Sequence, residues 1–203
     1  MLKTLKRDWW KLLLIVLVCG GIPILTSEKM LGLYTQNILG KLSEIQMYVI
    51  TGVILLVISF LDIFLNQILP ACIHEQRNLW NIAWKYLVLR ILCEIILAIA
   101  PIILPLQEVK FLFTAVMLVY SIIFYTLFLG FLCAAANSTG LLVGIKNLFT
   151  QYLLKYICIL LIVIIVQKAT RFIQIDFIHS VLFSIIQIAI VYICLPLFKK
   201  QAN

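Results

Sequence analysis

Six long apolar runs constrain the fold of this chain more than any other feature. An α-helix rises about 1.5 Å per residue, so about 20 apolar residues cross a hydrocarbon core of about 30 Å. Two of the runs are short, and flanking aromatic residues at the interface would complete them. We therefore predict an all-α membrane bundle of six transmembrane helices with interfacial amphipathic helices. The runs are 10–25, 47–69, 86–104, 111–135, 152–166 and 177–197.

The composition excludes a soluble globular protein with an ordinary surface. Hydrophobic residues make up 65% of the 203 residues, and charged residues make up only 12%, whereas a soluble domain carries about 25% charged residues. The six runs leave no segment long enough for a separate soluble domain. We therefore expect residues 1–203 to form a single integral membrane domain.

The basic residues sort by membrane side, which predicts the topology. Cytoplasmic loops of membrane proteins carry an excess of Lys and Arg. If the runs alternate in direction, ten bases flank them on one side and five on the other, so we expect a multi-pass protein of the bacterial inner membrane with both termini in the cytoplasm. The larger set is Lys3, Lys6, Arg7, Lys11, Arg77, Lys85, Lys146, Lys155, Lys199 and Lys200, and the smaller set is Lys29, Lys41, Lys110, Lys168 and Arg171.

The net charge of +8 also raises the possibility of nucleic-acid binding. Such binding needs bases clustered with stacking aromatic residues on a soluble face. Here the bases are distributed over the ends of apolar runs instead. We therefore expect no nucleic-acid partner.

Two segments on the predicted cytoplasmic side combine aromatic and basic residues. We expect residues 78–85, with Trp80, Trp84 and Lys85, to lie in the headgroup plane after Pro70 has ended the second span. We expect residues 140–152 to form a second amphipathic helix in that plane. These segments are candidate docking sites for a partner or for anionic lipid. The candidate docking residues are Trp80, Trp84, Lys85, Lys146 and Phe149. A third amphipathic segment, 26–46, is expected on the outer face.

Three charged residues fall inside the predicted spans. Ionisable groups at such depth cost roughly 2.5–3.5 kcal/mol each on insertion scales, so they need a partner, a wet cavity or a function. Arg90 and Glu94 are one helical turn apart, and Asp62 lies at a depth similar to that of Arg90, roughly 8–11 Å from the same side. We predict an ion pair between Asp62 and Arg90. A snorkelling Arg90 or a transport role for all three residues are the alternatives.

The sequence offers weak signals for metal binding or catalysis. Cys72, His74 and Glu75 supply ligand types, but a structural zinc site needs four ligands, and no second pair occurs at a recognisable spacing. Cys72 and His74 are two residues apart, so on a helix they would point to different faces. No hydrolase, metalloprotease or phosphate-binding motif is found in the sequence. We expect no catalytic residue, no metal and no cofactor.

Two segments carry a resemblance to known proteins. In EQRNLWNIAWKYLVLRIL and STGLLVGIKNLFTQYLLKY, a polar amphipathic piece leads into an apolar span. This architecture resembles bacterial six-helix membrane families of mostly unknown function, including the membrane domain attached to some glycerophosphodiester phosphodiesterases. The resemblance implies a membrane bundle over most of the chain, and it assigns no functional residue.

These observations favour a non-enzymatic accessory or permease-like subunit of a transport, export or self-protection assembly. Its expected partners are membrane lipid and a cytoplasmic ATPase or another membrane subunit. One alternative is a self-sufficient small transporter or channel that uses Asp62, Arg90 and Glu94. Another is a membrane enzyme with Cys72 or His74 in its site. A continuous polar path between helices would favour the transporter, and a cleft joining a cysteine to His74 would favour the enzyme.

Overall fold

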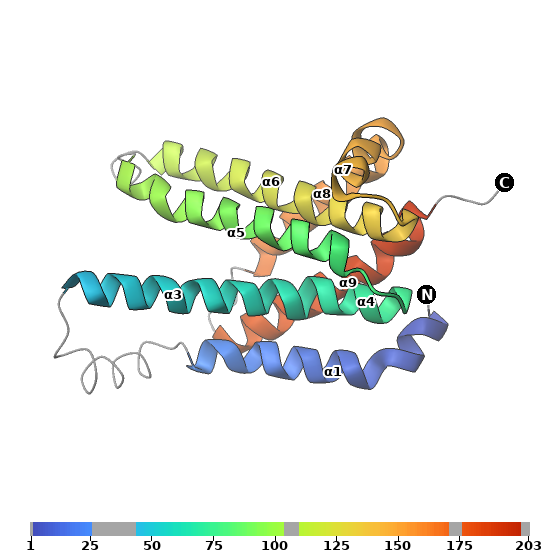
Figure 1. The fold of residues 1–203 in the computed structure, drawn as a ribbon, viewed down its shortest axis with the longest axis horizontal. Helices are drawn as coiled ribbons and strands as arrows, with labels where there is room; N and C mark the ends of the chain where they lie inside the picture. The colour runs from blue at the N-terminus through green and yellow to red at the C-terminus, as the bar shows by residue number, and fades with distance from the viewer. Residues whose placement is uncertain (1, 26–43, 104–109, 171–175, 200–203) are drawn as a thin grey trace.

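A computed structural model describes residues 2–25, 44–103, 110–170 and 176–199, and within these ranges the chain is helical with no strand (Figure 1). Most of the long helices run roughly along one direction, and the last one is inclined to the others (Figure 1). The expected outer segment 26–46 falls largely outside the described residues. The elements are α1 (Leu2–Leu25), α3 (Glu44–Ile63), the π-helix η2 (Phe64–Ile68), α4 (Leu69–Glu75), α5 (Trp80–Ile103), α6 (Lys110–Asn137), α7 (Leu141–Thr150), α8 (Leu153–Thr170) and α9 (Asp176–Phe198).

The all-helical fold is confirmed, and several helices have the length and composition of membrane spans. Within the described residues, three stretches are long and apolar enough to cross a membrane: Gly52–Glu75, Thr114–Asn137 and Ile178–Phe198. The helices α7 and α8 meet at 98° and would form a fourth span if taken together. α1 covers the first predicted run, and α5 covers the described part of the third.

Apolar side chains face outward on many of the long helices. Leu17, Val57, Ile96, Ile162 and Ile165 are all more than half exposed. A soluble monomer rarely exposes apolar surface on this scale, because water would penalise it. This surface is compatible with a location in lipid.

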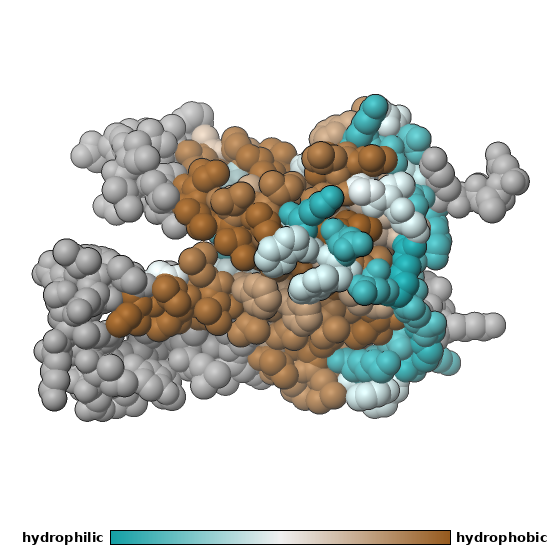
Figure 2. Space-filling view, in the orientation of Figure 1, coloured by the Kyte–Doolittle hydropathy of each residue, from teal (hydrophilic) through white to brown (hydrophobic). Residues whose placement is uncertain are grey.

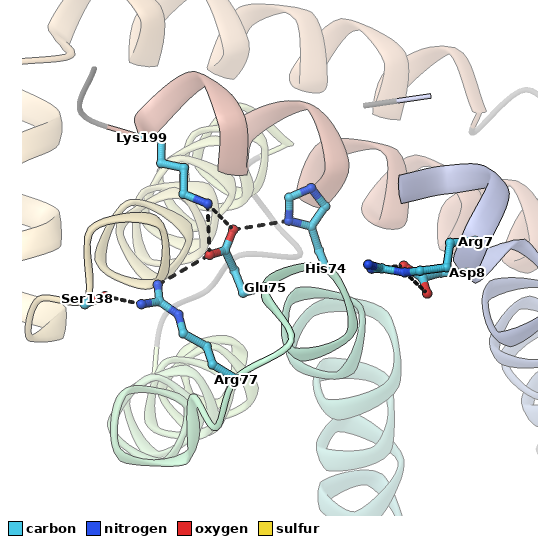
Figure 3. Close-up of polar contacts among 7 residues, drawn as sticks. All are labelled: Arg7, Asp8, His74, Glu75, Arg77, Ser138 and Lys199. Carbon is cyan, nitrogen blue, oxygen red and sulfur yellow. Dashed lines mark hydrogen bonds and ion pairs between the residues drawn. The ribbon is translucent and has the colours of Figure 1, made fainter. Parts of the chain in front are cut away.

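Polar residues gather at one end of the bundle. The start of α1, the α4–α5 turn, the α6–α7 turn and the end of α9 all lie there (Figure 1), and in the view of Figure 2 hydrophilic residues concentrate at the same end while apolar residues cover the middle. We call the region formed by Arg7, Asp8, residues 74–85, residues 137–141 and Lys199 the polar end. Arg7, Arg77 and Lys199, three of the bases assigned to the cytoplasmic side, lie within it (Figure 3).

The prediction that the second span ends at Pro70 is wrong. Pro70 does not end the second span, because the helix continues through α4 to Glu75. The π turn η2 comes just before Pro70, and the Leu69 N–H bonds to the Phe64 carbonyl oxygen. A π turn widens the helix and rearranges its hydrogen bonds, so it accommodates a ring that lacks an N–H donor. The helix ends instead at Gln76, whose φ of 54° is left-handed.

The segment 78–85 is not a separate helix in the headgroup plane. Its residues from Trp80 onward form the first turns of α5, which continues without a break to Ile103. The Trp80 N–H donates to Asn78 Oδ1 over 2.8 Å, so Asn78 caps the start of this helix. No Gly occurs between Trp80 and Ile103, and the one Pro comes only at 101. Nothing in the sequence therefore separates the amphipathic piece from the span.

The segment 140–152 does contain a separate helix, α7, which packs closely against α6. A Cβ atom added to Gly144 would lie 2.5 Å from the Gly130 carbonyl oxygen and 2.6 Å from Ala134 Cβ. Small residues therefore let the two backbones approach each other. Leu141 and Leu148 are buried in the same contact region. The inner face of α7 is used for packing within the protein, and Leu142, Lys146 and Phe149 remain exposed.

The last turn of α9 is held by donors from α6, the α7–α8 turn and α8. Asn137 Nδ2 and Tyr152 Oη donate to the Phe198 carbonyl oxygen over 2.8 and 2.9 Å. Lys155 Nζ donates to the Leu197 carbonyl oxygen over 3.2 Å. Terminal carbonyl groups of a helix lack intrahelical donors, so these bonds fix the end of α9 and position Lys199 at the polar end.

Candidate functional site

The charged residues Arg90 and Glu94 form an ion pair inside the bundle. Arg90 Nη2 lies 2.9 Å from Glu94 Oε1, and the two side chains are only 3% and 21% exposed. Arg90 Nη1 also donates to Tyr120 Oη over 3.1 Å, and its guanidinium carbon lies 3.6 Å from the centre of the Phe124 ring. A partner on the same helix and an aromatic face on α6 therefore compensate the buried charge.

The predicted ion pair between Asp62 and Arg90 is not found among the ion pairs of the described residues. Asp62 Oδ1 instead accepts a hydrogen bond from Asn66 Nδ2 over 2.6 Å. Both charged residues thus have partners one turn further along their own helices. The local spacing of four residues satisfies each of them without a bond between helices.

A buried chain of polar side chains links four helical elements. Tyr86 Oη donates to Gln67 Oε1, and Gln67 Nε2 donates to Gln187 Oε1 over 3.5 Å. Gln187 Nε2 in turn donates to Tyr125 Oη over 3.4 Å. These residues belong to η2, α5, α6 and α9 and are all buried. Buried polar groups bonded in this way specify how the helices pack.

Gln187 and Tyr125 were not among the candidate residues taken from the sequence. Each is a polar group within a long apolar run, which is the signal that could have marked them. Which helix face carries them could not be known without the packing. In the structure Gln187 bonds directly to Gln67 in η2, and Tyr125 joins the same network through Gln187.

At the polar end, the Glu75 carboxylate contacts three basic side chains from two parts of the chain (Figure 3). Its carboxylate lies 3.2 Å from His74 Nδ1, 3.6 Å from Arg77 Nη2 and 3.4 Å from Lys199 Nζ. The Arg77 Nη1 group donates to Ser138 Oγ in the α6–α7 turn. This cluster joins the α4–α5 turn to the ends of α6 and α9.

A second ion pair lies on α1 at the same end. Arg7 donates from Nε and Nη2 to the two carboxylate oxygens of Asp8 over 3.0 and 2.7 Å. These hydrogen bonds hold the pKa of Asp8 below its ordinary value. Asp8 is buried and Arg7 is exposed. The pair therefore keeps the carboxylate of Asp8 ionised inside the protein, with its cationic partner at the surface.

Cys72, His74 and Glu75 do not assemble into a metal site. Within the described residues there is no group of three or more His, Cys, Asp or Glu side chains that could hold a metal ion. The His74 ring bonds to Glu75 and packs edge-on against Tyr192 at a centroid distance of 5.0 Å. Cys72 is a free, partly buried cysteine on α4. The contacts of these residues therefore connect the α4–α5 turn to α9.

Three of the five candidate docking residues share one exposed face. Trp80 and Trp84 are about half exposed, with their ring centres 6.5 Å apart, and Lys85 follows them on α5. Lys146 and Phe149 are exposed on α7, and Phe149 packs against the Tyr156 ring. The structure therefore brings the three α5 residues together, whereas Phe149 packs against α8.

Two adjoining clefts separate the start of α5 from the α6–α7 turn and α7. A cleft of about 350 Å³ includes Arg77, Lys85, Ser138 and Thr139 in its lining. A second cleft of about 360 Å³ shares Lys85 and Leu141 with the first, and its remaining lining residues are Trp84, Val88, Leu89 and Leu142. The first is polar and cationic, and the second is apolar.

The geometry thus offers a buried polar network between the helices and an amphipathic cleft at the polar end. Comparisons of the chain with protein-family models, with curated proteins and with solved structures found no match. Any function proposed for the protein rests on the chemistry of these two regions.

Proposed function

We propose that this chain is a non-enzymatic, multi-pass membrane protein that works as an accessory or permease-like subunit. In this proposal the polar end faces the cytoplasm and docks a partner, such as a peripheral ATPase or another membrane subunit. The observation that supports it is the concentration of basic residues and exposed tryptophans at one end of an apolar bundle. Cationic and aromatic residues favour the headgroup region and attract acidic partners.

The proposed topology has six spans, with both termini and the α4–α5 and α6–α7 turns in the cytoplasm. Single cysteine reporters can test it in a variant from which the native cysteines have been removed. Reporters at Asn78 and Asn147 should react only after the membrane is permeabilised, because the excess of Lys and Arg retains these segments inside. Reporters at Gln36, Gln107 and Lys168 should react in intact cells. Labelling of Asn147 from outside would contradict this topology.

Docking is expected to depend on the exposed bases of α5 and α7. Substitution of Lys85 and Lys146 together by Gln should preserve expression and topology, because neither side chain is buried. It should weaken recovery of the partner after cross-linking in native membranes, since each base contributes about 1 kcal/mol toward an anionic surface. The measurement is the ratio of cross-linked partner to this protein, determined by quantitative mass spectrometry.

A control variant separates docking from general loss of structure. Substitution of Lys6 by Gln on α1 removes another exposed base that lies away from α5 and α7, and it should leave partner recovery near the level of the unmodified protein. If the Lys85 and Lys146 variant keeps every associated protein and full activity, the docking proposal is wrong.

The self-sufficient transporter is the second candidate function, and one observation favours it. In the part of the chain that the structure describes, Asn66 Oδ1, Arg90 Nε and Glu94 Oε2 are buried without a hydrogen-bond partner. Polar atoms of this kind normally bind another group, so an ion or a polar substrate inside the bundle would satisfy them. Loss of activity in Asp62→Asn, with docking intact, would place this candidate first.

A further inference from the structure

We infer that the cleft between the start of α5 and the α6–α7 turn binds the headgroup of an anionic phospholipid. The phosphate would occupy the polar cleft, and an acyl chain would follow the apolar cleft that adjoins it. This inference rests on the proposed function in one respect, namely that the polar end lies at a membrane interface.

The polar cleft presents donors that lack a full set of partners in the protein. Thr139 Oγ1 and Arg77 Nε are buried and have no hydrogen-bond partner among the described residues. Both residues line the cleft. Buried donors left unpaired cost about 1–3 kcal/mol each, and phosphate oxygens would satisfy them because they accept several hydrogen bonds at once.

The first turn of α7 adds backbone donors at the same place. Gly140 and Leu141 line the cleft, and the N-cap Gly140 supplies no side-chain hydrogen bond to the helix. The first N–H groups of a helix have no intrahelical acceptor and carry a partial positive charge. A phosphate group in the cleft would lie beside these groups as well as beside Arg77 and Thr139.

The charge of the cleft favours an anion. Lys85 lines it and forms no ion pair with any described residue. The carboxylate closest to Arg77 is that of Glu75, which Lys199 and His74 also contact. One carboxylate therefore faces two permanent cations here, Arg77 and Lys199, and Lys85 adds a third positive charge.

The apolar cleft identifies the ligand as a lipid rather than a free phosphate. It continues from Lys85 along α5 through Val88 and Leu89, with Leu142 of α7 on its other side. This direction leads from the polar end toward the apolar part of the bundle, so it matches the orientation of a phospholipid in the cytoplasmic leaflet. Trp84 lines the same cleft, and tryptophan favours the headgroup boundary.

The test is native mass spectrometry of the full-length protein extracted from nanodiscs that contain phosphatidylcholine with or without phosphatidylglycerol. The unmodified protein should retain phosphatidylglycerol in preference to phosphatidylcholine. Lys85→Gln should reduce that retention about fivefold, the factor that corresponds to about 1 kcal/mol per base. Thr139→Val should also reduce it, without lowering thermal stability in lipid-free detergent, because the hydroxyl has no partner in the protein.

Lys146→Gln is the matched control, since Lys146 is an exposed base on α7 that does not line either cleft. Retention should be unchanged in it. Equal losses in Lys85→Gln and Lys146→Gln would overturn the site in favour of diffuse attraction. Equal retention of both lipids would overturn it too. Displacement of the lipid by inorganic phosphate or glycerol 3-phosphate at matched concentrations would point to a soluble anion instead and would also overturn it.

Lipid retention in the nanodiscs and partner recovery in native membranes together distinguish this inference from the proposed function. Failure of the lipid site would show as unselective lipid retention while the cross-linked partner is still recovered. Failure of the docking proposal would show as full partner recovery in the variant lacking Lys85 and Lys146, whichever lipid is retained.

Discussion

Substitution of Glu94 by Gln is expected to lower the thermal stability of the protein in detergent more than substitution of Arg90 by Met. Glu94 is the carboxylate that pairs with Arg90, whose side chain is almost fully buried. An arginine cannot release its proton, so removal of Glu94 leaves a permanent charge in a medium of low dielectric. Loss of one member of a buried pair costs about 3 kcal/mol. When Arg90 is lost instead, the unpaired side chain is that of Glu94, which is 21% exposed against 3% for Arg90, so its charge is less completely buried and the expected loss of stability is smaller.

The double variant Arg90→Met with Glu94→Gln should recover part of the stability lost in Glu94→Gln alone. A thermal unfolding series over the two single variants and the double variant measures the coupling between these residues. The corresponding cycle of Arg90→Met with Asp62→Asn is the control, and it should show weaker coupling because Asp62 bonds to Asn66 instead. Strict additivity between Arg90 and Glu94 would contradict the pairing described above.

Substitution of Gly144 by Ala is expected to destabilise the protein by about 3 kcal/mol, the upper part of the range for overpacking in a core. The added methyl group would lie 2.5 Å from the Gly130 carbonyl oxygen and 2.8 Å from the Ala134 nitrogen. Both are backbone atoms, so relief requires α7 to move away from α6. Thermal unfolding in detergent, together with loss of selective phosphatidylglycerol retention, would report this displacement.

Gly52→Ala provides the matched control within a helix. A Cβ atom at Gly52 would meet nothing within 4 Å, and Ala is favoured over Gly in a helix interior by about 0.5–1 kcal/mol. This variant should therefore be as stable as the unmodified protein or slightly more stable. If both glycine variants behave alike, the contact between α6 and α7 is not as close as the structure indicates.

The sequence by itself determined the helical class and the approximate positions of the helices. Long apolar runs leave the backbone no alternative to internal hydrogen bonds when the surroundings are apolar, and this rule depends only on local composition. Residues 140–152 are also predicted to form an amphipathic helix, because their apolar residues recur on one face while Lys146, Asn147 and Thr150 lie on the opposite face. That helix is observed as α7.

Only the tertiary structure decided which polar residues meet. The similar depth of Arg90 and Asp62 predicts an ion pair between them. Depth does not reveal how each helix is rotated about its axis, and in the structure Arg90 faces Phe124 and Tyr120 instead. The chain of Gln67, Tyr86 and Gln187 joins residues up to 120 positions apart. The cleft at Lys85 likewise lies between the start of α5 and residues 138–141, which are distant in the sequence. Such contacts depend on packing between distant segments, and the periodicity of a single run carries no information about its neighbours.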